Sequence, residues 1–147
     1  MHIFAFDLAT ETGWCVRQAD VVLASGTWNL APKRGDSGGM RFIYLRTRLK
    51  ELLAAYGKPS HVVYEQAHHR GGAATQVGVG LATHLQGWCA ENEIEYTAVP
   101  SMTLKKQATG TGKASKDDMM RHASVLVGRE ITNDNEGDAI CLAFYEA

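Results

Sequence analysis

The sequence predicts an α/β domain in which a five-stranded mixed sheet carries helices on both faces. Apolar residues run continuously or alternate through residues 2–30, which is typical of strands, and short apolar runs then alternate with segments of helical period. The resulting order, βββαβαβαα, indicates a mixed sheet covered on both sides. A chain of 147 residues suits one such domain, so we expect residues 1–147 to fold as a single unit.

The first three expected strands lie close together in the chain. Residues 2–8 form an apolar run, and residues 13–16 and 21–30 form the next two strands, joined by a polar turn at 18–20. This spacing predicts an antiparallel meander.

Helices and strands alternate after this meander. Apolar positions spaced by threes and fours predict a helix over 39–56, ended by Gly57. A β-branched run predicts a strand over 61–65, followed by a helix over 75–92 and a strand over 94–99.

The C-terminal third is expected to be mostly helical. Ser101 can cap a short turn, and a glycine-containing loop follows at 110–112. Ser115 and Asp118 form a capping box that begins the next helix, and a last helix is expected over 134–145.

The net charge of -1 hides a strong segregation of charge. Residues 33–50 contain six Lys or Arg and one Asp, a local charge of +5, whereas residues 130–147 contain five acids and no base, a local charge of -5. The two patches cancel in the total, so the sum does not describe either surface.

Nothing in the sequence predicts a membrane protein. No stretch approaches the roughly 20 apolar residues of a membrane span. The apolar N-terminal run is too short for a secretory signal and is not followed by a cleavage site. We therefore expect a cytoplasmic protein.

Two acidic residues come at the ends of expected strands. Asp7 lies within FAFDLAT and Glu65 within VVYEQ, and each strand is apolar up to its acid. Either residue alone would be an ordinary turn residue. If the two strands are parallel neighbours, however, both carboxylates lie at the sheet edge where α/β proteins place their sites.

The third acidic group lies in the expected last helix. Residues three and four apart share a helix face, so Asp134 and Asn135 should lie beside Asp138. Glu136 belongs to another face, and we interpret it as the capping partner of Asn133. A glycine in the first turn makes an irregular turn possible, which keeps Glu136 as an alternative.

These carboxylates predict a metal site. Converging carboxylates repel one another and raise one another's pKa unless a cation lies among them. Oxygen ligands without His or Cys favour Mg²⁺ or Mn²⁺ over zinc, and two such ions can drive phosphodiester hydrolysis. The expected ligands are Asp7, Glu65, Asp138, and Asp134 or Asn135.

The ordered set of motifs resembles the RuvC family of Holliday-junction resolvases, within the RNase H-like superfamily, over nearly the whole chain. The acidic motifs are Asp7 followed by Thr12-Gly13-Trp14, then Val63-Tyr64-Glu65-Gln66, and Asp138-Ala139. Between Glu65 and Asp138, three further pieces resemble the family's basic segment and the loop that leads into the next helix. They are Lys105-Lys106-Gln107, Gly110-Thr111-Gly112 and Lys116.

The resemblance implies a fold, an activity and a partner. The fold is RNase H-like, with strands one to three antiparallel and strands four and five parallel to the first. The activity is structure-selective, two-metal-ion hydrolysis of four-way DNA junctions, with Mg²⁺ as the cofactor and Mn²⁺ as its substitute. A two-fold junction calls for a homodimer. The small size and the divergent last motif are compatible with a phage or bacterial member of the family, which we expect in the bacterial cytoplasm or at the nucleoid.

The family holds its metals with four acidic positions, and this chain departs at one of them. Asn135 stands where the family usually has an acid, three residues before Asp138. Whether Asp134, Glu136 or the Asn135 amide completes the site therefore stays open.

Basic and polar residues near these motifs are expected to contact DNA. By resemblance Lys105, or Lys106 after a shift of one residue, lies near the scissile phosphate and stabilises transition-state charge. Residues 101–130 carry a local charge of +3, which favours phosphate contacts. The expected DNA-binding residues are His68, Arg70, Gln76, Lys105, Lys106, Lys113 and Lys116.

Other functions share parts of this pattern. An RNase H-like nuclease acting on other branched DNA or on RNA/DNA hybrids has the same carboxylates, and an inactive nucleic-acid-binding module has the same fold. An actin-like kinase needs two such domains. The run Gly110-Thr111-Gly112-Lys113 is not a P-loop, because Gln107 and Ala114 occupy required positions, so we expect no nucleotide cofactor.

Overall fold

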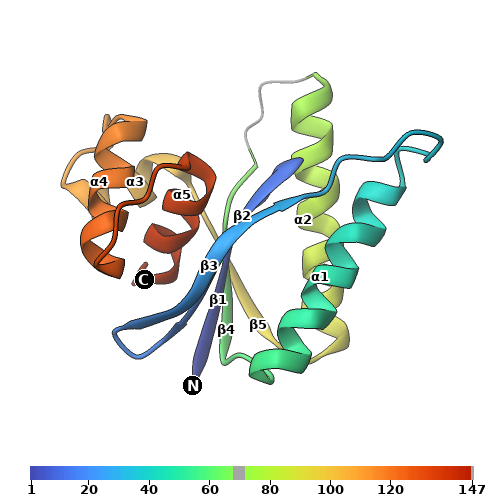
Figure 1. Cartoon of the computed structure of the whole chain (residues 1–147), viewed down its shortest axis with the longest axis horizontal. Helices are drawn as coiled ribbons and strands as arrows, with labels where there is room; N and C mark the ends of the chain where they lie inside the picture. The colour runs from blue at the N-terminus through green and yellow to red at the C-terminus, as the bar shows by residue number, and fades with distance from the viewer. Residues whose placement is uncertain (68–71, 147) are drawn as a thin grey trace.

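The computed structural model describes residues 1–67 and 72–146, and a central sheet separates two helical layers (Figure 1). The strands are β1 (His2–Asp7), β2 (Glu11–Gln18), β3 (Val21–Asn29), β4 (His61–Glu65) and β5 (Glu95–Val99). The helices are α1 (Met40–Tyr56), α2 (Ala73–Glu91), α3 (Ser101–Thr109), α4 (Lys116–Val127) and α5 (Asp134–Ala143).

The sheet has the order β3-β2-β1-β4-β5. β1, β2 and β3 form an antiparallel meander, while β4 pairs parallel with β1 and β5 pairs parallel with β4. The predicted mixed sheet is confirmed. Because β1, β4 and β5 run in the same direction, their carboxyl ends meet at one edge of the sheet.

Each face of the sheet has its own core, because alternate side chains of a strand point to opposite faces. Phe4 and Phe6 of β1 pack with residues of α1 and α2 on one face, whereas Ala5 packs with residues of α4 and α5 on the other. No helix within residues 1–67 and 72–146 is long and apolar enough to cross a membrane.

The predicted short turn after the last strand is wrong, since α3 is a helix of nine residues. Leu104 anchors it in the core of the α4 and α5 face, where the side chain is 2% exposed. Pro100 is the N-cap residue, and no side chain caps the helix, so Ser101 does not have its predicted capping role. Burial of a single leucine leaves little periodic signal in so short a segment.

The two predicted capping boxes have different outcomes. At α4, Ser115 and Asp118 form both reciprocal hydrogen bonds, as predicted. At α5, Asn133 Oδ1 accepts hydrogen bonds from the backbone of the first turn, but Glu136 does not bond back to Asn133. The Glu136 carboxylate instead accepts a hydrogen bond of 2.7 Å from Ser25 of β3. The prediction for Glu136 as a capping partner is therefore wrong.

Candidate active site

Asp7, Glu65 and Asp138, called the acidic trio below, converge at the carboxyl edge of the sheet. One carboxylate oxygen from each residue lies within 4.8 Å of the others. Phe6 of β1 pairs with Tyr64 of β4, so the next residue of each strand places an acid at this edge. Helix α5 packs against β1 and β2 and supplies the third carboxylate.

A glycine allows α5 to approach the sheet closely enough for this. Gly13 of β2 is the cross-strand partner of Asp7, and a Cβ atom at Gly13 would lie 1.9 Å from the backbone oxygen of Asn135. Backbone oxygen cannot move aside as a flexible side chain can, so any larger residue would displace the first turn of α5. Asp138 follows that turn directly, and its place beside Asp7 depends on Gly13.

The acidic trio is electrostatically strained in the absence of a cation. The pKa of Asp7 is raised from 3.8 to about 9, mainly by burial and then by the charges of Asp138 and Glu65. The pKa of Asp138 is raised from 3.8 to about 7, again mainly by burial and then by the charges of Glu65 and Asp134. A hard divalent cation would remove this repulsion, and the all-oxygen donor set suits one.

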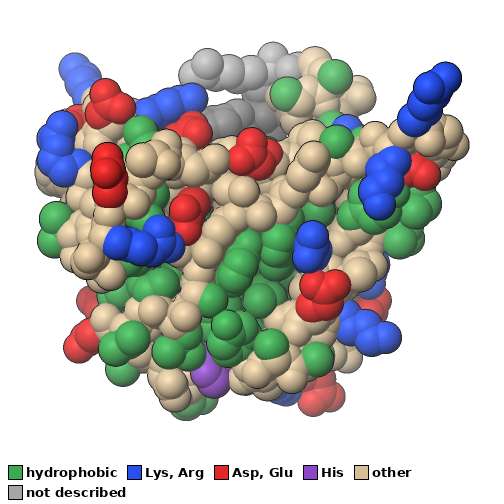
Figure 2. All heavy atoms as spheres, in the orientation of Figure 1, with side chains coloured by type: hydrophobic (Ala, Val, Ile, Leu, Met, Phe, Trp, Pro, Cys, Tyr) green, Lys and Arg blue, Asp and Glu red, His purple; other side chains and the backbone are tan. Residues whose placement is uncertain are grey.

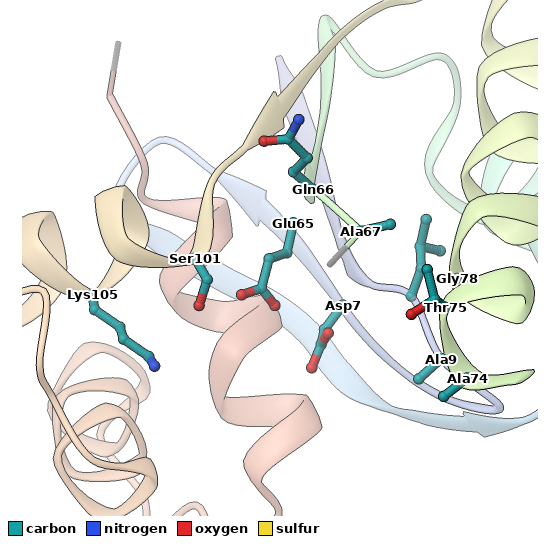
Figure 3. A pocket seen from close by; sticks show the side chains of 11 residues that line it. Asp7, Ala9, Glu65, Gln66, Ala67, Ala74, Thr75, Gly78, Ser101 and Lys105 are labelled. Atoms are coloured by element: carbon teal, nitrogen blue, oxygen red, sulfur yellow. The ribbon is translucent and has the colours of Figure 1, made fainter. Parts of the chain in front are cut away.

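A cleft of about 540 Å³ opens beside Asp7 and Glu65 (Figure 3). Figure 3 shows the side chains of Asp7, Glu65, Ser101 and Lys105 along one part of its wall and the first residues of α2 along another. The lining residues are Asp7, Leu8, Ala9, Glu65, Gln66, Ala67, Ala74, Thr75, Gly78, Ser101 and Lys105. The carboxylates of Asp7 and Glu65 are therefore accessible to a ligand in this cleft.

A smaller cleft of about 160 Å³ also includes acidic-trio residues. Its lining residues are Glu65, Ser101, Leu104, Lys105, Lys116, Met119 and Asp138. Lys105 and Lys116 both oppose the rise in the pKa of Asp138, which shows that their ammonium groups lie near the carboxylates. The site thus combines an acidic centre with two basic side chains.

The three candidates for the fourth metal-ligand position have different surroundings. Asp134 contributes to the raised pKa values of Asp7 and Asp138, and it forms an ion pair of 3.2 Å with Lys116. Asn135 has its backbone oxygen against Gly13. Glu136 is held by Ser25 and by an ion pair of 3.0 Å with Arg129. Of these three candidates, Asp134 is therefore the one whose charge acts on the trio.

The predicted DNA-binding residues do not all gather at the clefts. Lys105 lines both clefts and Lys116 lines the smaller one. The exposed Lys106 and Lys113 lie on α3 and on the loop before α4 and line neither cleft. Gln76 is exposed in the first turn of α2. The two remaining predicted residues, His68 and Arg70, lie outside the described residues.

Sequence reasoning missed Ser101, which lines both clefts. Asp7 and Glu65 were identified as polar residues at the ends of neighbouring parallel strands, and Ser101 has a comparable position. Ser101 follows Val99 and Pro100 at the end of β5, the parallel neighbour of β4, so it reaches the same sheet edge. Its interpretation as a capping residue concealed this position.

Known proteins with similar sequences share one description. No protein-family model matches the chain. The crossover junction endodeoxyribonuclease RuvC of Brachyspira hyodysenteriae is 30% identical over 108 residues, which cover 73% of this chain and 67% of the relative. The RuvC protein of Rickettsia conorii is 26% identical over 98% of this chain and 95% of its own length.

Solved structures give the same result for the fold. T. thermophilus RuvC in complex with Holliday junction substrate matches with a TM-score of 0.82 and 18% identity, covering 97% of this chain and 90% of that one. The Fowlpox virus resolvase, in complex with substrate Holliday junction DNA, matches with a TM-score of 0.60 and 11% identity, covering 96% and 94%. Together with the sheet order, these likenesses confirm the predicted RNase H-like fold class.

Proposed function

Because the chain belongs to the RuvC family of crossover junction endodeoxyribonucleases, we propose that it is a structure-selective endonuclease that cuts four-way DNA junctions. The observation that carries this proposal is the convergence of the acidic trio beside a cleft that two of its carboxylates line. Its proposed location is the cytoplasm of a bacterial host or its nucleoid.

The acidic trio is the proposed binding site for two Mg²⁺ ions, with Mn²⁺ as a substitute. The raised pKa values of Asp7 and Asp138 support this assignment, because they reflect burial first and then repulsion among the carboxylates, and a bound divalent cation offsets both. When bound, the ions supply the Lewis acidity for hydrolysis of a phosphodiester to 5′-phosphate and 3′-hydroxyl ends.

The protein's own cations have the complementary task of holding the phosphate. Lys105 lies between the two clefts, so its ammonium group can stabilise negative charge that develops on the phosphate at the acidic trio. The exposed bases Lys106, Lys113 and Lys116, together with Gln76, are proposed to contact the DNA backbone on either side. His68 and Arg70 are proposed to do so from the segment after β4.

Asp134 is the proposed fourth metal-site acid, reached when its ion pair with Lys116 opens. We expect Asp134→Asn to weaken Mn²⁺ binding about tenfold or more, because a nearby negative charge is lost. Asn135→Ala is the control from the adjacent position and should leave Mn²⁺ affinity nearly unchanged. Calorimetric titration of both variants checks this, and the opposite ranking of the two would assign the position to Asn135.

Symmetric cutting of a two-fold junction needs two active sites, so the proposed active form is a homodimer. Helices α1 and α2, which pack against each other, each expose an aliphatic side chain: Ile43 is 50% exposed and Val79 is 44% exposed. We propose that the two copies meet through this layer. Sedimentation of wild type and Val79→Glu would reveal whether dimerisation depends on this face.

Incubation with three substrates tests the proposed activity. The wild-type protein is mixed with a four-way junction, a linear duplex and an RNA/DNA hybrid, each with Mg²⁺ or with EDTA. We expect paired nicks in opposite strands of the junction with Mg²⁺, and none of comparable rate in the other samples. Preferred cutting of the hybrid or of other branched DNA would favour the alternative nuclease. Binding without any cutting would favour an inactive module.

A further inference from the structure

The loop between β3 and α1, residues 30–39, begins at the same edge of the sheet as the acidic trio. β3 runs in the same direction as β1, because each is antiparallel to β2. The backbone N–H of Leu30 donates a hydrogen bond of 2.7 Å to the oxygen of Thr10, three residues after Asp7. In Figure 1 the loop extends from this edge on the side of α1, opposite α3 and α4.

The acid of this loop is hydrogen-bonded within the loop and to α1. The carboxylate of Asp36 accepts a hydrogen bond of 2.8 Å from the backbone N–H of Lys33 and another from the hydroxyl of Tyr44. The hydrogen bond from Tyr44, and then the bond from Lys33, lowers the pKa of Asp36, so this carboxylate stays ionised and engaged. The Lys33 ammonium lies 5.3 Å from the centre of the Tyr44 ring.

The basic side chains of this loop, by contrast, face solvent. Lys33 and Arg34 are exposed, and neither forms an ion pair with any residue in 1–67 or 72–146. Arg46 and Arg48, further along the same basic segment, are paired with Glu91 and Glu51. Figure 2 shows Lys and Arg side chains at the upper right of the view, in the region of the loop, with further Lys and Arg on the opposite side of the molecule.

We propose that the loop at residues 30–39 binds the phosphate backbone of a double-stranded arm that flanks the cut site. This inference rests on the proposed nuclease function and names a second DNA-binding surface for it. The acidic centre would then lie between two basic surfaces, one on α3 and α4 and one on this loop. A duplex arm suits this surface better than a single strand, because Lys33 lies over the Tyr44 ring and leaves it closed to base stacking, while the exposed Lys33 and Arg34 can contact phosphates. Binding at this surface is independent of base sequence.

Reversal of two charges tests the loop. In Lys33→Glu/Arg34→Glu, we expect junction and duplex affinity in EDTA to fall about tenfold near 0.1 M salt. The slope of log Kd against log salt should decrease by about 2, since each phosphate contact contributes about 0.9. In single-turnover cleavage with Mg²⁺, the protein concentration for half-maximal rate should rise, while the rate at saturation stays within about twofold, because the acidic trio is unchanged.

A matched control separates this effect from a general change of charge. Lys50→Glu/Lys58→Glu makes the same charge change at two exposed residues outside the loop. Lys58 is two residues from Ser60, whose backbone N–H bonds to His2 at the edge of the sheet opposite the acidic trio. An equal loss of affinity in this control, or an unchanged slope in the loop variant, would overturn the proposal.

Lys33→Ala/Arg34→Ala repeats the slope measurement if the double glutamate variant unfolds at a lower temperature. Failure of the wild type to cut junctions would contradict the proposed function, while the slopes still decide the role of the loop.

Discussion

Replacement of Asp7 by asparagine is expected to abolish cleavage and, at the same time, to stabilise the metal-free protein. Cleavage should fall about 1,000-fold or more, because a carboxylate of the acidic trio is lost. Stability should rise because the folded protein holds Asp7 at a pKa of about 9, whereas the unfolded chain has the ordinary value of 3.8. At a pH above 3.8 the wild-type protein must therefore take up a proton at Asp7 when it folds, which costs free energy. Asn is neutral in both states, so the variant avoids this cost.

The size of this stabilisation follows from the pH. One unit of pKa shift corresponds to about 1.4 kcal/mol, and pH 8 lies about four units above the unfolded pKa of 3.8. The full shift therefore corresponds to about 6 kcal/mol, and we expect a gain of at least about 2 kcal/mol at pH 8 in EDTA. Urea unfolding of both proteins measures it, and Asp20→Asn, an exposed acid in the turn between β2 and β3, is the control. An Asp7→Asn variant that is less stable than wild type in EDTA, or that still cuts junctions, would contradict the assignment.

The second large effect is a loss of wild-type stability in EDTA as the pH rises from about 4 to about 9. Asp7 and Asp138 have raised pKa values of about 9 and about 7, so the folded state binds more protons than the unfolded state in this range. Protonation of the two carboxyls contributes fully to stability below the unfolded pKa of 3.8, and this contribution is lost as the pH rises through the pKa of each group in the folded protein. The contribution of Asp138 is lost by about pH 7, and that of Asp7 declines further, to about pH 9.

Divalent metal should reverse this pH dependence. Metal ligands must be deprotonated, so Mg²⁺ is expected to stabilise the protein strongly at pH 8 and only weakly at pH 5. Thermal unfolding at both pH values, with Mg²⁺ or with EDTA, provides the comparison. Identical stabilisation at the two pH values, or a stability in EDTA that rises towards pH 9, would be inconsistent with a cation-dependent acidic trio.

Local sequence patterns predicted Asp7 and Glu65 because the relevant information is local. Each strand is apolar up to its acid, and the intervening helix indicates that the two strands are parallel. Parallel pairing then leaves only the register to be determined, and the pairing of Phe6 with Tyr64 brings the two acids together. The face of α5 that carries Asp138 followed from helical spacing in the same way.

Contacts between distant segments could not be predicted in this way. One partner of Glu136 is Ser25, which is 111 residues away, and no pattern around Glu136 distinguishes it from a capping residue. The close approach of Asn135 to Gly13 likewise depends on how α5 docks on β2. The choice among the three candidates for the fourth position therefore depends on packing.

The proton balance of metal binding tests the central claim most directly. Mn²⁺ is titrated calorimetrically into the DNA-free wild-type protein at pH 7.5, in two buffers with different ionisation enthalpies. With Asp7 at a pKa of about 9, we expect binding to release about one proton per site, and we expect Asp7→Asn to remove both the binding and the release. Mn²⁺ binding that Asp7→Asn leaves intact, or no binding at millimolar Mn²⁺, would show that the acidic trio is not the metal centre.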